Sequence, residues 1–182
     1  MATSRIPMSN NNLARLTLAC MLALSGTCSL AQSGNGTDNP DWAEEATPPP
    51  PAFSKDRLIP IDMPSYVSIK VGVDPETIAV GSDGVVRYVI VMANATGSTN
   101  AVYEGIRCVT DEVKTYARLN ASGAWVTQAK TDWKPVNDNM PSRHAQAFAR
   151  QGGCQSRLAT SKQEIIDALR SGQKPGLGKR SN

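Results

Sequence analysis

The sequence is poor in the residue types that build metal and redox sites. One histidine, His144, and four cysteines occur among 182 residues. Zinc sites usually take four His, Cys or carboxylate ligands at close spacing, and the sequence shows no such cluster. It also lacks an apolar run of roughly 18 residues, the length that a membrane-spanning helix needs. We therefore expect no metal, no other cofactor and no transmembrane segment.

Residues 1–31 have the pattern of a cleavable signal peptide. Arg5 and Arg15 supply its basic region, a short apolar run follows, and Ala31 is a small residue that suits a signal peptidase. The residue before Cys28 is a threonine, which fits a lipidation site poorly. We expect a periplasmic protein that is exported and cleaved, with a lipoprotein as the less favoured alternative.

Little net charge remains without this leader. Of the 19 basic residues 2 lie in the leader, whereas all 16 acidic residues follow it, so the net charge falls from +3 to about +1. Nucleic-acid-binding surfaces show a clustered basic excess. The one basic run lies in residues 172–182, which we interpret as a flexible tail. Nucleic acid is therefore not an expected partner.

Only Cys108 and Cys154 lie outside the leader. An even pair of cysteines in an oxidising compartment predicts one disulfide, in preference to free or metal-binding thiols. A bridge that closes a loop of this length contributes about 4 kcal/mol in the chain-entropy model.

The rest of the chain divides into a spacer and a domain. Residues 32–57 are polar and contain four consecutive prolines, which favour extended polyproline II geometry and predict a disordered spacer. The domain is expected over residues 58–171. Apolar and polar residues alternate between turn signals, a pattern typical of strands. The expected strands are 65–71, 78–80, 85–93, 101–109, 113–119 and 124–129.

The last third of the domain changes to a helical period. Residues 142–151 predict a short helix, and Ser161 with Glu164 forms a capping box for a helix over residues 160–172. Strands followed by helices predict an α+β fold. We expect an antiparallel β-meander of five or six strands, with one or two C-terminal helices packed on the sheet and one disulfide. Trp133 is expected to fill the gap between sheet and helix.

Glu104 raises a question about the phase of the strand at 101–109. Strict alternation places it on the buried face with Ile106, where an unpaired carboxylate would be costly or would take up a proton. A bulge at Gly105 would instead turn Glu104 outward beside Arg107. We favour the bulge, and a buried, functional Glu104 is the alternative.

With the bulge, a basic patch that carries a tyrosine forms on the outer face of the sheet. Its members are Glu104, Arg107, Lys114, Tyr116 and Arg118. Such a surface suits an anionic envelope component or an acidic segment of another periplasmic protein. The alternative is that long basic side chains merely cover an exposed sheet face.

Several motifs resemble the CNP-like family of small exported proteins from Gram-negative bacteria. They are "VDPETIAVGSDGVVRYVIV" and "NAVYEGIRC" in residues 73–108, "W" and "PV" in residues 133–136, Cys154, and "SKQEIIDALR" in residues 161–170. The resemblance covers most of the domain. It implies an exported location and this architecture, and it implies no catalytic residues. The order of the parts is more loosely similar to the surface-adhesin E type of domain, which would imply a binding module.

Enzymes need a nucleophile with a base, paired acids, a phosphate loop or a metal, and none occurs here at recognisable spacing. Glu104 and Asp111 are close in sequence, but a predicted turn separates them. We therefore expect a non-enzymatic periplasmic module that binds a partner or supports the envelope. An adhesin-like surface module and a small periplasmic enzyme without a recognisable motif are the alternatives.

Overall fold

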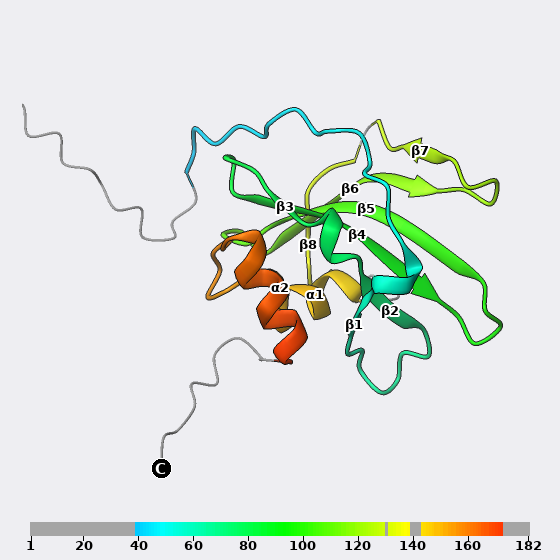
Figure 1. Ribbon diagram of the computed structural model, residues 1–182. Coiled ribbons are helices and arrows are strands. Elements are labelled where there is room, and N and C mark those ends of the chain that lie inside the picture. The colour runs from blue at the N-terminus through cyan, green and yellow to red at the C-terminus, as the bar shows by residue number, and fades with distance from the viewer. Residues whose placement is uncertain (1–38, 130, 139–142, 173–182) are drawn as a thin grey trace, which may run out of the picture. The chain divides into compact units, whose positions relative to one another are not determined.

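The computed structural model describes residues 39–129, 131–138 and 143–172. These residues form an α+β fold, as predicted (Figure 1). The strands are β1 (Ile59–Ile61), β2 (Lys70–Val73), β3 (Ala79–Val80), β4 (Val85–Ala93), β5 (Thr99–Arg107), β6 (Glu112–Leu119), β7 (Trp125–Thr127) and β8 (Lys134–Pro135). The helical elements are the 3-10 turns η1 (Lys55–Arg57) and η2 (Pro75–Thr77), helix α1 (His144–Phe148), the π-helical turn η3 (Ala149–Gly153) and helix α2 (Lys162–Ser171).

The strands form an antiparallel sheet in the order β1-β2-β4-β5-β6-β7. The short strand β3 also pairs with β4, and β8 also pairs with β6. The first seven residues of β4 are buried. An apolar run at 85–93 predicts this burial, because a central strand is covered on both faces. The predicted antiparallel meander is confirmed. The strand expected over residues 65–71 is instead the short strand β2, which begins at Lys70, and β1 and β8 are additional short strands.

The two faces of the sheet carry separate apolar clusters, because successive side chains of a strand point to opposite faces. On the helix face, α1 and α2 cover Tyr88 of β4, whose ring lies 4.0 Å from that of Phe148. On the opposite face, Tyr103 and Tyr116 pack with Val89 of β4. Figure 1 shows the two helices, in yellow to orange, together on one side of the sheet.

Helix α2 begins and ends where the sequence predicts. The Ser161 side chain accepts a hydrogen bond from the Glu164 amide, and the Glu164 side chain reaches back to the Ser161 amide. Such a cap contributes about 1 kcal/mol. Gly172 ends the helix in the left-handed conformation. The helix buries Ile165, Ile166 and Leu169 against the sheet.

The disulfide between Cys108 and Cys154 is confirmed, with the two Cα atoms 5.6 Å apart and 46 residues of sequence separation. Cys108 directly follows β5, and Cys154 directly follows η3. Gly153 is needed there, because a Cβ atom would lie 2.3 Å from the ring of Phe148. The bridge therefore holds the turn after α1 against the end of a central strand.

Residues 39–57, which we expected to belong to a disordered spacer, instead pack on the domain. We call residues 39–53 the N-terminal strap. Its aromatic residues provide the reason: Trp42 packs on Trp133, and Phe53 packs on Trp125, each with ring centroids 5.9 Å apart. The boundary at residue 58 is therefore too late. The expected leader, residues 32–38 of the expected spacer and residues 173–182 of the tail lie outside the described residues.

Candidate functional site

Glu104 lies on the helix face, so the predicted outward orientation is wrong. Its side chain is fully buried, and alternation continues unbroken along β5 through Val102 and Ile106. The bulge is in β6 instead: Tyr103 pairs with Ala117, whereas Glu104 pairs with Thr115. One extra residue, Tyr116, lies between these partners.

Gly105 has a packing role in place of the predicted bulge. A Cβ atom at this position would lie 2.5 Å from the Tyr116 hydroxyl and 2.8 Å from a methyl group of Val85. The missing side chain leaves room for the Tyr116 ring on the strap face. A glycine within a strand can mark a close approach of neighbouring atoms as well as a bulge, and at Gly105 it marks the close approach.

Glu104 has polar partners from three different elements. Its carboxylate lies 2.8 Å from Nε2 of His144 on α1, and it accepts longer hydrogen bonds from the hydroxyls of Tyr88 and Thr115, at 3.5 and 3.3 Å. Burial, and then the neighbouring carboxylate, raise the pKa of the Tyr88 hydroxyl, which keeps it a donor. Both Glu104 and His144 are closed off from solvent. This cluster therefore orients α1 on the sheet and offers a substrate no access.

The residues of the predicted basic patch do not form one open surface. Arg107, Lys114 and Tyr116 do come together on the strap face, but the strap covers them. Arg118 stays exposed toward the other end of β6. The acidic segment expected from a partner is thus supplied by the chain itself.

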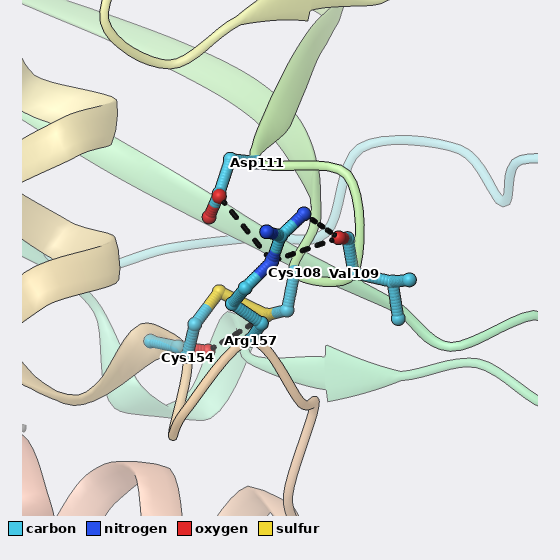
Figure 2. Close-up of a disulfide and its surroundings, with 6 residues drawn as sticks. Cys108, Val109, Asp111, Cys154 and Arg157 are labelled. Carbon is cyan, nitrogen blue, oxygen red and sulfur yellow. Dashed lines mark hydrogen bonds and ion pairs between the residues drawn. A yellow bond between two sulfur atoms is a disulfide. The ribbon is translucent and has the colours of Figure 1, made fainter. Parts of the chain in front are cut away.

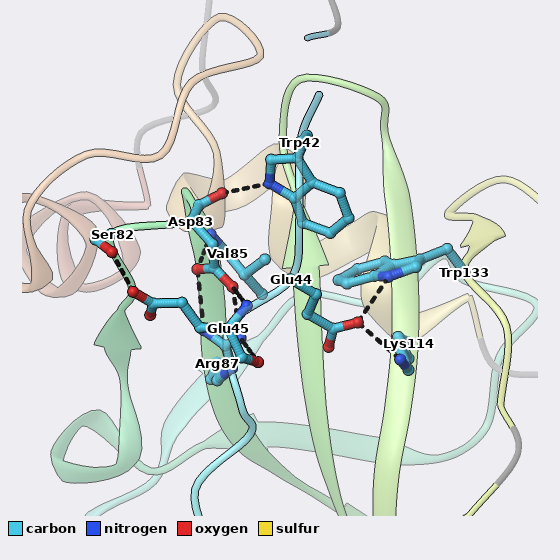
Figure 3. Close-up of polar contacts among 9 residues, drawn as sticks. All are labelled: Trp42, Glu44, Glu45, Ser82, Asp83, Val85, Arg87, Lys114 and Trp133. Atoms are coloured by element: carbon cyan, nitrogen blue, oxygen red, sulfur yellow. Dashed lines mark hydrogen bonds and ion pairs between the residues drawn. The ribbon is translucent and has the colours of Figure 1, made fainter. Parts of the chain in front are cut away.

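Two acidic residues of the strap bind this face (Figure 3). Glu44 Oε2 accepts hydrogen bonds from Lys114 Nζ at 2.7 Å and from Trp133 Nε1 at 3.2 Å. Burial alone would raise the pKa of the Glu44 carboxyl, but the hydrogen bonds and the charge of Lys114 outweigh it and hold this pKa below its ordinary value. Glu45 donates its amide to Asp83 and accepts a hydrogen bond from Ser82.

The buried ion pair between Arg87 and Asp83 also contacts the strap. The guanidinium of Arg87 donates to both carboxylate oxygens of Asp83, at 2.7 and 3.1 Å, and it reaches the Glu45 carbonyl at 3.5 Å. Burial works against the charge of each partner, but the bidentate pair overcomes it, lowering the pKa of Asp83 and raising that of Arg87. The Trp42 indole also donates to the Asp83 carbonyl.

An open cleft of about 650 Å³ lies beside the disulfide. Three arginines line it: Arg143 precedes α1, Arg150 belongs to η3, and Arg157 follows Cys154. Figure 2 shows that Arg157 reaches across to the Val109 carbonyl and to Asp111. We call this site the arginine cleft.

Backbone strain gathers at the arginine cleft. Among the described residues, the non-glycine residues with positive φ are Asp111, Arg143, Ser156 and Arg157, and all of them line it. Such conformations cost roughly 1–3 kcal/mol each and concentrate at functional sites. Neither Arg143 nor Arg150 has an acidic partner within the described part of the chain.

Sequence reasoning missed the residues that matter most on both surfaces. Trp42 and Glu44 lie in a segment dominated by prolines, and their partners follow tens of residues later. Trp133, expected between sheet and helix, is half-buried on the strap face. A signal for the cleft existed, since Arg143 and Arg150 flank one short helix at a spacing of two turns.

Among the described residues, no three His, Cys, Asp or Glu side chains lie close enough together to hold a metal ion. The helices described here are also too short or too polar to span a membrane.

Comparison with known proteins gives one clear match. A model described as the CNP1-like family matches residues 37–170, which include the strap, and this confirms the predicted family. The crystal structure of protein E from non-typeable Haemophilus influenzae is similar at 13% identity over 70% of this chain and 97% of that chain, with a TM-score of 0.38. A similarity this weak does not indicate a shared function. No curated protein matches.

Proposed function

This chain belongs to the CNP1-like family, and on that premise we propose that it is an exported, non-enzymatic module of the bacterial envelope that binds an anionic partner in the arginine cleft. The family is compatible with an envelope-accessory or an adhesin-like module. The leader pattern of residues 1–31 supports export, and the pair Cys108–Cys154 suits an oxidising compartment.

The single observation behind this proposal is the pair of guanidinium groups at Arg143 and Arg150. Both line an open cleft, and neither is neutralised by an acidic side chain of the described residues. Arg107 and Lys114, by contrast, already contact Glu112 and Glu44. An incoming phosphate or carboxylate would therefore find its complementary charge in the cleft and not on the strap face. Guanidinium groups suit such ligands because they can donate two parallel hydrogen bonds.

The residues that support the arginine cleft suit ligand binding better than catalysis. The disulfide and the buried Glu104–His144 pair fix α1 and η3, so the arginines project from a rigid support. The acid and the histidine that a hydrolase would need are sealed inside this support. A preorganised site of this kind lowers the entropic cost of binding.

Titration with inorganic pyrophosphate, and with phosphatidylcholine vesicles with and without phosphatidylglycerol, tests the proposal. Arg143→Gln combined with Arg150→Gln should weaken binding about a hundredfold or more, because each lost charge-assisted hydrogen bond contributes about 1.5–3 kcal/mol. Arg118→Gln is the matched control and should change binding by less than about twofold.

The two probes separate the sources of the anion. Binding of pyrophosphate alone indicates a free ligand, whereas binding of the anionic vesicles indicates a lipid headgroup. The proposal fails if the wild-type protein ignores both probes at low salt, or if the double variant binds as well as the control.

A further inference from the structure

The strap docks through side chains and not through a strand ladder. Residues 43–53 belong to no strand in the structure. Their main anchors are Trp42 and Glu44, and peptide interfaces usually depend on a few such residues. The strap face is therefore built to receive a short peptide with a tryptophan and a carboxylate two residues apart.

The anchor site is specific for that pair of side chains. The Trp42 ring lies 3.8 Å from the guanidinium carbon of Arg107 and packs edge-on against Trp133. The carboxylate that follows is held by Lys114. Aromatic rings, a cation over a ring and an ion pair together define both position and direction of the peptide.

The other end of the strap is fixed independently. The Ser54 amide and the Arg57 guanidinium both donate to the Asp74 carboxylate, and Phe53 packs on Trp125. Between these anchors and Glu44 lie four prolines, residues 48–51. A polyproline stretch is stiff and rises about 3.1 Å per residue. Residues 39–47 and residue 54 are therefore held by separate contacts, and a stiff run that donates no backbone hydrogen bonds joins them.

We propose that the strap face also accepts the strap of a second copy of this chain, so that two molecules exchange residues 39–47 reciprocally. Exchange keeps the contacts of Trp42, Glu44 and Glu45 unchanged, because the docking surface is the same on both copies. Reciprocal exchange of an identical element closes a two-fold dimer at low cost. This inference concerns a different surface from the arginine cleft and does not depend on the proposed function.

A charge exchange at one ion pair tests the proposal. Chains with Glu44→Lys alone, or with Lys114→Glu alone, bring like charges together both within the molecule and in a homodimer. In an equimolar mixture, the unchanged strap of the Lys114→Glu chain meets the unchanged face of the Glu44→Lys chain, and the reciprocal contact pairs Lys with Glu. Sedimentation velocity should show monomers for each variant alone and a species of twice the mass in the mixture.

The chain that carries both Glu44→Lys and Lys114→Glu is the matched control, since its pair is restored within one molecule. It should not form mixed dimers with either single variant beyond the level of the wild-type protein. A mixture of the single variants that stays monomeric overturns the proposal and leaves the strap as an intramolecular element only.

A peptide experiment covers the case in which a charge-reversed chain does not fold. A synthetic peptide of residues 39–53 is added to the Trp42→Ala chain, whose own strap has lost its main anchor. The peptide should bind, and the same peptide with Glu44→Lys should bind about tenfold or more weakly. Equal binding of the two peptides, or no binding of either, contradicts the proposal.

Discussion

Glu104 connects three strands and a helix through one carboxylate. It belongs to β5, and its partners Tyr88, Thr115 and His144 come from β4, β6 and α1. A buried polar group is costly unless it is hydrogen-bonded, and here each carboxylate oxygen has a partner. The residue that sequence reasoning placed on the surface is therefore part of the core.

Removing this carboxylate should lower the free energy of unfolding substantially. Glu104→Ala removes the buried carboxylate that His144, Tyr88 and Thr115 all contact, so we expect urea unfolding to show a loss of about 3–5 kcal/mol. The matched control is Glu112→Ala on the neighbouring strand, whose long ion pair with Arg107 contributes about 1 kcal/mol or less. A loss at Glu104 no larger than that of the control would show that the cluster is not structural.

At the scale of elements, docking of the strap depends on a carboxylate whose pKa is lowered by its surroundings. Such a group stabilises the docked state fully above its undocked pKa, and the contribution is lost as pH falls through the docked pKa. For Glu44 this window lies below the ordinary value of 4.5. Asp83, whose pKa is also lowered, adds to the effect in the same direction.

Acid should therefore release the strap. Tryptophan emission should shift to the red as the pH falls from about 5 to about 3, because Trp42 leaves Trp133 and Arg107 for water. In the Glu44→Gln variant, emission at neutral pH should already be red-shifted and the acid step smaller. Emission that is independent of pH in the wild-type protein, with secondary structure retained, would contradict this account.

The sequence predicts the elements that local signals define. The apolar run of β4 and the capping box of α2 each contain their own signal, and each is confirmed. The bulge in β6 has no such signal, because Tyr116 shifts phase to pack its ring over Gly105. The strap could not be predicted for a related reason: Glu44 binds Lys114 and Trp133, which are 70 and 89 residues away.

At the scale of the whole molecule, the disulfide between Cys108 and Cys154 links the sheet to the helical part of the domain. The Cys108→Ser, Cys154→Ser double variant should lose about 4 kcal/mol, because the bridge closes a loop of 46 residues. The thermal midpoint should fall by roughly 10 °C or more. Reduction of the wild-type protein should reproduce this shift, and a change of less than about 1 kcal/mol in either experiment would show that the bridge adds little.

We propose that the arginine cleft holds an anionic partner in the envelope. Gln146 lies on α1 between Arg143 and Arg150 and lines the cleft, so it is the position for a photoreactive side chain. Cross-linking in the intact producing cell should give an adduct that fractionates with the periplasm or envelope and carries a phosphate or carboxylate by mass spectrometry. The adduct should be lost with Arg143→Gln and Arg150→Gln, and it should be absent when the photoreactive group replaces Arg118. An adduct at position 146 that persists without both arginines, or a protein that remains in the cytoplasm, would contradict the account.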